Sequence, residues 1–245
     1  MLVLAIDTST PVITAGVVDV KRPHELAEEL SAGATDPAPI RVLAEKTVTD
    51  AFGHAEYLMP LVAEALAEAG RTMPDLEAVA VGMGPGPFTG LRVGMATAAA
   101  LGDARNIPVH GVPSHDAAAR AVSDQGEFLV VTDARRKEVY VTAYGASGVA
   151  VHGPDIVSPA ALADWCSAHG AAPQWIAGAG AELAAGLGLP ARALARTMSE
   201  GLVTCAAHGL LTGAVPGPLT PLYLRRPDAT EPHAPKPVLP SPHQV

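Results

Sequence analysis

Both halves of the chain begin with the same kind of segment, and this repeat restricts the fold more than any other feature. Residues 2–7 read LVLAID, an apolar run that ends in an aspartate, and residues 128–133 read FLVVTD. A short apolar run bounded by polar turn residues is typical of a buried strand. The sequence therefore predicts two structural units of similar design.

The segments that follow each opening strand come in the same order. In the first half we expect strands at 12–19 and 41–49, a helix at 53–69, a strand at 76–82, a helix at 88–106 and a strand at 107–111. In the second half we expect strands at 137–144, 149–157 and 174–178, with helices at 158–170 and 180–187. The 53–69 segment has apolar residues at the i, i+3, i+4, i+7 spacing of an amphipathic helix.

This order predicts an α/β protein built from two βββαβα subdomains. It is the ribonuclease-H-like fold used twice, as in actin-like ATPases (the ASKHA group) and sugar kinases. We expect a first subdomain at 1–110 and a second, smaller one at 111–225, whose last helix packs back on the first. A Gly/Pro/Ala-rich loop insertion is expected at 31–40, and a proline-rich disordered tail at 226–245.

Charge argues against direct binding of nucleic acid. The chain has 16 Lys and Arg against 25 Asp and Glu, a formal net charge of −9, and such a chain repels phosphate backbones. Contact with RNA is therefore expected only through a partner.

Cys166 and Cys205 form no CxxC pair, which favours a reducing compartment. No leader pattern or membrane-length apolar run is present, so we expect a cytoplasmic protein with no membrane association.

The segment 82-GMGPGPFTGLRVGM-95 lies where a parallel-sheet enzyme would hold a phosphate. It fails the G-x-G-x-x-G pattern because Pro87 occupies the last glycine position, and it contains no Gly-Lys pair for a P-loop. Pro85 and Pro87 also remove two backbone N–H donors. A stiff strand-to-helix turn is favoured over a phosphate cradle.

The turns that follow the opening strand of each half carry further candidate site residues. Asp7, Thr8 and Ser9 occupy the turn where an actin-like ATPase would bind metal and phosphate, and two interpretations stay open: a vestigial nucleotide site, or side chains that only satisfy the turn. The equivalent turn of the second half carries Asp133 and Arg135, for which a structural Asp–Arg pair is favoured.

His54 is the remaining metal-ligand candidate, on the first long helix. A second ligand would be expected four residues later, where the chain has Leu58. We therefore predict no metal site, and interpret His54 as a core or interface histidine.

The two long helices of the first subdomain have two interpretations. Their apolar residues either pack on their own sheet or form a helical protein–protein interface, since small residues allow close helix approach and methionine adapts to different partners. We favour the interface. The residues predicted to face a partner are His54, Leu58, Leu61, Val62, Leu66, Leu91, Met95 and Ala98.

Six motifs, taken in order along the chain, resemble the TsaB (YeaZ) family of bacterial tRNA threonylcarbamoyladenosine biosynthesis proteins. They are AIDTST, HAEYLMPLV, GMGPGPFTGLRVG, PSHDAAA, VTDARRKEVY and PLYLRR. The fifth motif is carried by Asp133, Arg135, Glu138, Val139 and Tyr140. Pro87 departs from the family, which more usually has serine there, and the resemblance does not cover 31–40 or the tail.

The resemblance implies a duplicated actin-like fold and a role as an inactive paralogue of the catalytic protein TsaD. TsaD has a His-x-x-x-His metal motif on the equivalent helix, of which His54 and Leu58 here keep only half. Family members pair with TsaD through the helices of the first subdomain, form homodimers through the same surface, and act with the ATPase TsaE. The complex transfers a threonylcarbamoyl group to N6 of adenosine 37 in tRNAs that read codons beginning with A.

The expectation is therefore a non-catalytic scaffold and activator without a cofactor of its own, ATP and metal being held by the partner subunits. The second helix would be positioned by Gly84, Gly86, Phe88, Thr89, Gly90 and Arg92. Two alternatives stay open: an actin-like ATPase or kinase that uses Asp7 and the glycine loop, and a glycopeptidase-like metalloprotease, against which Leu58 argues.

Overall fold

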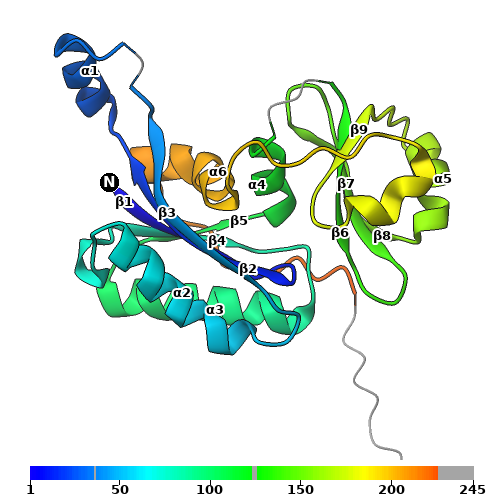
Figure 1. The fold of residues 1–245 in the computed structure, drawn as a ribbon, viewed down its shortest axis with the longest axis horizontal. Coiled ribbons are helices and arrows are strands. Elements are labelled where there is room, and N and C mark those ends of the chain that lie inside the picture. Colours follow the sequence, from blue (N-terminus) through cyan, green and yellow to red (C-terminus); the bar gives the residue numbers. More distant parts are fainter. Residues whose placement is uncertain (36, 123–125, 226–245) are drawn as a thin grey trace, which may run out of the picture.

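A computed structural model describes residues 1–35, 37–122 and 126–225 as two sheet-based subdomains side by side (Figure 1). The first sheet has five strands in the order β3-β2-β1-β4-β5. These are β1 (Leu2–Asp7), β2 (Val12–Val20), β3 (Ile40–Thr49), β4 (Ala78–Gly82) and β5 (Val109–Val112). β1 runs antiparallel to β2 and parallel to β4, and β4 runs parallel to β5.

The position of β1 at the centre of the sheet explains why its residues 2–6 are all apolar. Successive side chains point to opposite faces, and both faces are covered. Leu4 and Ile6 pack under α2 (His54–Glu68) and α3 (Phe88–Arg105), while Val3 and Ala5 pack under α4 (Ser114–Arg120) and α6 (Met198–Thr212). Figure 1 shows the pairs α2/α3 and α4/α6 on opposite sides of the sheet.

The second subdomain repeats this order in reduced form. Its sheet has the order β8-β7-β6-β9, from β6 (Phe128–Asp133), β7 (Val139–Tyr144), β8 (Ala150–Val157) and β9 (Trp175–Ala177). A parallel bridge between Ile176 and Ala191 stands where a fifth strand would lie. The 3-10 helices η2 (Pro159–Ala161) and η3 (Ala181–Leu187) pack with α5 (Leu162–Ala168) on this sheet. The predicted fold class is confirmed.

Several elements differ from the sequence prediction. Residues 31–40 are not all loop, because α1 (Pro23–Ser31) ends at the first of them and β3 begins at the last. The helix α1 is short and has no buried residue; Leu26 and Leu30 are its two apolar positions at helical spacing, too few to have predicted it. The short α4 and the 3-10 helix η1 (Met73–Asp75) were not expected, and the segment 180–187 is a 3-10 rather than an α-helix. The predicted tail at 226–245 lies outside the described residues.

The last described helix, α6, belongs by packing to the first sheet. Leu202 and Val203 are fully buried against β1 and its neighbours. Thr197 caps the helix, since its hydroxyl oxygen accepts the backbone N–H of Glu200 at 3.2 Å. Among the described residues, none of the helices combines the length and apolar composition required to cross a bilayer.

Candidate functional site

The most polar part of the core is the turn Asp7–Thr8–Ser9, where β1 ends between the two subdomains. All three side chains are buried, with exposed fractions of 2%, 0% and 2%. In open α/β sheets, ligands bind outside the carboxyl ends of the parallel strands. The turn therefore lies where a ligand of this fold would be expected.

The Asp7 carboxylate is satisfied by neighbouring protein groups. Its Oδ1 accepts the backbone N–H of Ser9 at 2.8 Å and the Ser9 hydroxyl at 2.6 Å, and its Oδ2 accepts the Ser114 hydroxyl at 2.6 Å. Burial raises the pKa of Asp7, and these hydrogen bonds oppose that rise. Both carboxylate oxygens are thus used within the chain.

The glycine loop lies directly against this turn. A Cβ atom on Gly86 would lie 2.2 Å from the carbonyl oxygen of Ser9, and one on Gly90 would lie 2.5 Å from that of Thr8. The Thr8 hydroxyl donates to the carbonyl oxygen of Gly90 at 2.8 Å. Only glycine permits such close backbone approach. The glycines therefore let the loop and the start of α3 occupy the space beside Thr8 and Ser9.

Gly84 and α4 close the turn from another side. The Gly84 N–H donates to the Ser114 hydroxyl at 3.2 Å, and the Gly84 carbonyl accepts the Ser114 N–H at 2.7 Å. Ser114 therefore contacts both Asp7 and the glycine loop, a link that sequence reasoning missed. The PSHDAAA motif was its only signal.

A cavity of about 140 Å³ remains between the subdomains, lined by Asp7, Ser114 and His115 among others. Pockets for ligands of drug or nucleotide size usually measure about 300–1,000 Å³. The His115 ring nitrogens lie 2.8 Å from the Thr142 hydroxyl and 2.9 Å from the Thr132 hydroxyl. Burial lowers the pKa of His115 to about 3, so the ring is neutral at pH 7.

His54 is a satisfied, nearly buried side chain. Its exposed fraction is 7%, and its Nε2–H donates to the carbonyl oxygen of Thr10 at 3.0 Å. Leu58, one helical turn later, is 1% exposed. Within the described ranges, no group of three or more His, Cys, Asp or Glu side chains is arranged to hold a metal ion.

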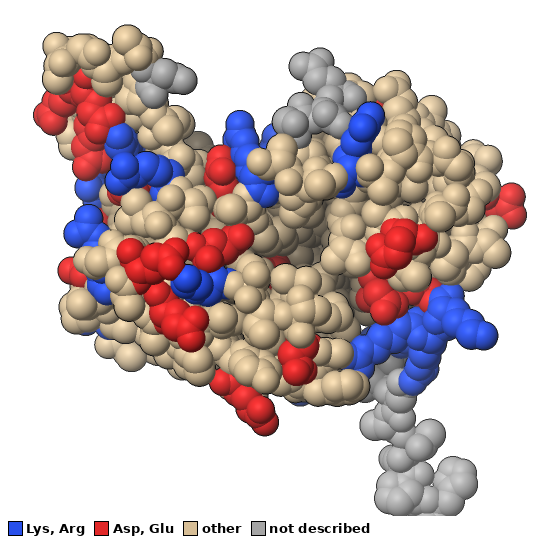
Figure 2. Space-filling model, in the orientation of Figure 1, with Lys and Arg blue, Asp and Glu red and all other residues tan. Residues whose placement is uncertain are grey.

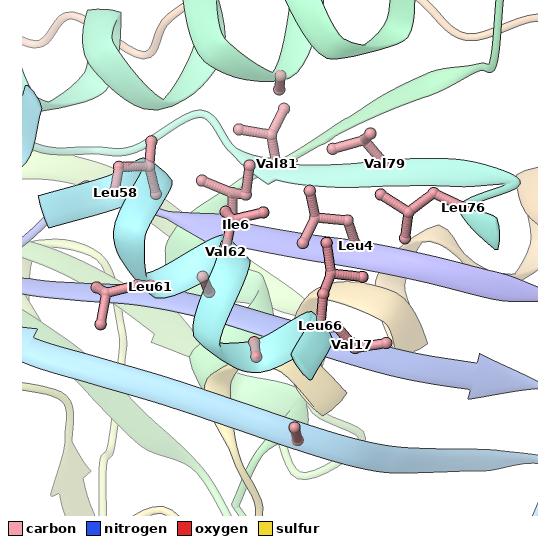
Figure 3. Close-up of a cluster of buried hydrophobic side chains, with 14 of the residues drawn as sticks. Leu4, Ile6, Val17, Leu58, Leu61, Val62, Leu66, Leu76, Val79 and Val81 are labelled. Carbon is pink, nitrogen blue, oxygen red and sulfur yellow. The ribbon is translucent and has the colours of Figure 1, made fainter. Parts of the chain in front are cut away.

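The predicted interface side chains do not face outward, and that part of the prediction is wrong. Figure 3 shows that the α2 residues labelled there lie within the core between helix and sheet. On α3, Leu91 and Ala98 are fully buried and Met95 is 6% exposed. The helical spacing of apolar residues marks the face that a helix turns to its own sheet. The buried set is His54, Leu58, Leu61, Val62, Leu66, Leu91, Met95 and Ala98.

The outward face of the same helices carries other residues. Met59 on α2 is 39% exposed, and Ala63, one helical turn later, is exposed on the same side. Tyr57, also 39% exposed, lies on the other flank of the helix. On α3, Ala96 and Ala100 are exposed. A partner that docks on α2 and α3 would meet these side chains.

Arg92 and Phe88 connect α3 to the last described segment. The Arg92 Nε–H donates to the Tyr223 hydroxyl at 3.0 Å, and its guanidinium lies 3.8 Å from the centre of the Phe88 ring. The Phe88 and Tyr223 rings stack with centroids 4.8 Å apart. Thr89, beside them, is exposed. This cluster fixes the start of α3 against residues near the end of the described chain.

The Asp133 turn forms a different contact from the predicted side-chain pair. The Asp133 carboxylate accepts the backbone N–H of Arg135 at 2.7 Å, whereas the Arg135 guanidinium donates to the carbonyl oxygen of Ala51 at 3.2 Å. Beside this turn lies a second cavity of about 350 Å³, lined among others by Phe88, Arg136 and Tyr223.

Comparison with known proteins identifies the family. A family profile described as "TsaD: tRNA N6-adenosine threonylcarbamoyltransferase" matches residues 42–208, more than half of the chain. Uncharacterized protein Rv3421c of Mycobacterium tuberculosis is 48% identical over 230 residues, which covers 93% of each chain. The protein named TsaB of Haemophilus influenzae is 36% identical over 104 residues, 41% of this chain and 42% of the relative.

A solved structure of a related protein has the same fold. YeaZ from Pseudomonas aeruginosa has a TM-score of 0.64 at 24% identity, covering 91% of this chain and 99% of that one. At this identity the likeness supports the fold. Together with the sequence matches, it shows that the chain belongs to the family of the TsaD profile and, within it, to the TsaB (YeaZ) group.

Proposed function

We propose that this chain is a non-catalytic subunit that binds TsaD and holds it in its active arrangement. Its family takes part in the biosynthesis of threonylcarbamoyladenosine in tRNA. The proposed reaction of the complex is transfer of a threonylcarbamoyl group to N6 of adenosine 37 in tRNAs that read codons beginning with A. TsaE would supply ATPase activity, and ATP and metal would be held by the partner subunits.

One observation carries the non-catalytic part of the proposal. The turn where an actin-like enzyme would bind phosphate is filled by the chain's own groups: Asp7 is bonded to Ser9 and Ser114, and the glycine loop touches Ser9. A nucleotide phosphate would have to displace these contacts. The groups that phosphate binding would need are instead used to join β1, the glycine loop and α4.

The partner surface is proposed to be the outward side of α2 and α3, with TsaD and a second copy of this chain competing for it. These helices lie side by side on one face of the first sheet (Figure 1). Among the exposed side chains on this side, Met59, Ala63 and Ala96 are uncharged and mostly small, which allows close helix approach, while Glu56 and Glu64 of α2 are exposed beside them. A cytoplasmic location fits the proposed tRNA substrate.

Co-expression of this chain with TsaD and TsaE tests the proposal. We expect a stable complex with TsaD, and threonylcarbamoyladenosine at position 37 of an unmodified tRNA transcript only when all three proteins are present. Undiminished modification without this chain would contradict the activator role. Failure to co-purify with TsaD would contradict the scaffold role.

The two enzymatic alternatives have separate tests. An ATPase or kinase using Asp7 would bind Mg-ATP with micromolar affinity in calorimetry, and Asp7→Asn would abolish its turnover. A metalloprotease would retain about one equivalent of metal per chain after purification, and we expect none to be retained.

A further inference from the structure

One surface of this acidic protein is basic. It lies where the β6–β7 turn, the start of α3 and the last described residues meet, around the 350 Å³ cavity. Figure 2 shows Lys and Arg side chains gathered on the second subdomain near the end of the described chain. We call it the cationic surface and define it by Phe52, Arg92, Arg135, Arg136, Lys137 and Arg225.

The acidic groups on this surface do not cancel its cations. Asp50, Asp133 and Glu138 are nearby, and Glu138 pairs with Arg225. Among the described residues named here, five cations stand against three carboxylates, an excess of two positive charges on a chain whose formal total is −9. Such a local reversal of sign attracts an anionic partner that the rest of the molecule repels.

The backbone that presents three of these cations is strained. Arg135, Arg136 and Lys137 have φ angles of 60°, 55° and 62°, in the left-handed region. This region costs a side-chain-bearing residue about 1–2 kcal/mol, and glycine or asparagine would adopt it more readily. All three side chains are nevertheless long, charged and exposed. Strain of this kind is typically retained at functional sites.

An aromatic ring lies next to the cations. Phe52 is 89% exposed, and the Arg135 guanidinium is 5.6 Å from its ring centre. The Phe88 ring is already stacked on Tyr223 and covered by Arg92. Phe52 is therefore the ring available to an incoming base, and base–aromatic stacking contributes about 1–3 kcal/mol in complexes with single-stranded nucleic acid.

We infer that the cationic surface binds a single-stranded segment of the tRNA directly, its phosphates on Arg135, Arg136 and Lys137 and one unstacked base on Phe52. This rests on the proposed function and revises the expectation that RNA is reached only through a partner. A strand fits better than a free nucleotide because Phe52 and Lys137 lie outside the cavity lining, so the contacts extend beyond one nucleotide.

The test uses the purified complex with TsaD and an unmodified tRNA transcript, with binding measured at several salt concentrations. For the triple variant Arg135→Glu, Arg136→Glu, Lys137→Glu we expect at least tenfold weaker binding. The slope of log K against log salt should be less steep by about 2, since each lost phosphate contact removes about 0.7 for a single strand. Phe52→Ala should weaken binding without changing the slope.

Matched variants separate charge and folding effects. Arg41→Glu, Arg120→Glu, Arg196→Glu makes the same change in total charge at exposed positions that lie neither on this surface nor on α2 or α3. This control should bind tRNA within threefold of wild type. The neutral pair Arg136→Asn, Lys137→Asn tolerates the left-handed backbone and should still show weakened binding and a reduced slope.

Three outcomes would overturn the inference. One is unchanged affinity and slope in the triple variant, and a second is competition of millimolar ATP for the tRNA. The third is loss of TsaD from the triple variant with tRNA binding intact, which would make this a protein-docking surface. The proposed function fails separately, if the wild-type chain neither binds TsaD nor supports modification.

Discussion

The Ser114 hydroxyl donates a hydrogen bond to the Asp7 carboxylate across 2.6 Å, between residues 107 positions apart in the chain. Asp7 ends the central strand of the first sheet, and Ser114 begins α4, the helix that precedes the second sheet. The same hydroxyl accepts the N–H of Gly84. The carboxylate at the expected phosphate position therefore holds three segments of the fold together.

Ser114→Ala should destabilise the protein by about 1–3 kcal/mol, because Asp7 Oδ2 loses its partner while it remains buried. Urea unfolding measures the change. Ser167→Ala, which removes an exposed helical hydroxyl, is the control and should change stability by less than about 0.5 kcal/mol. If Ser114→Ala is as stable as this control, the hydrogen bond does not have the structural role assigned to it.

The residue pattern within a single segment was enough to predict strands and helices, because their formation depends mainly on that segment. The apolar runs of β1 and β6 and the spacing of α2 were sufficient to predict these three elements and the duplicated order of the two halves. The Asp7–Ser114 contact was not predictable, because it joins side chains that meet only through the sheet topology. The short α4 has too few residues to show a helical period.

The interface residues show the opposite limitation. Leu58 and Met95 were assigned to a partner because apolar side chains suit interfaces, but the same side chains suit the core. Spacing identifies an apolar face without identifying what covers it. Tyr57 and Met59 lie between the core positions of α2, and only the structure shows that they are exposed.

Aspartate substitutions on α2 distinguish its two faces. Leu61→Asp, at a position 8% exposed, should destabilise the protein by about 3 kcal/mol or more, because it buries a carboxylate. Met59→Asp with Ala63→Asp should leave the melting temperature within a few degrees of wild type and abolish co-purification with TsaD. Retained TsaD binding in this double variant would exclude the outward face of α2 as the docking surface.

His115 should make stability depend on pH in a defined direction. Its pKa is about 3 in the folded protein and 6.5 when unperturbed, so only the unfolded state takes up this proton between those values. The contribution is fully present above pH 6.5 and is lost as the pH falls toward 3, by up to about 1.4 kcal/mol per pH unit. His115→Gln lacks this dependence.

The measurement is the free energy of unfolding of wild type and His115→Gln at pH 7 and pH 5. The stability advantage of wild type should shrink by about 2 kcal/mol over this range. The exposed His208→Gln serves as the control and should change equally little at both pH values. A constant difference between wild type and His115→Gln would show that the ring accepts its proton in the folded state.

The strained turn at 135–137 predicts opposite effects of one substitution on stability and on tRNA binding. Lys137→Gly relieves the left-handed strain at a φ of 62° and should raise the free energy of unfolding by about 1 kcal/mol. Lys137→Ala removes the same charge but keeps a Cβ atom, so it should leave stability nearly unchanged.

Both variants should weaken binding of the tRNA transcript to the TsaD complex by the same factor of about two to five, since one phosphate contact is lost in each. Thermal unfolding and salt-dependent binding measure the two effects independently. Equal stability of the glycine and alanine variants would remove the argument from strain, and unchanged binding in both would remove Lys137 from the RNA contact.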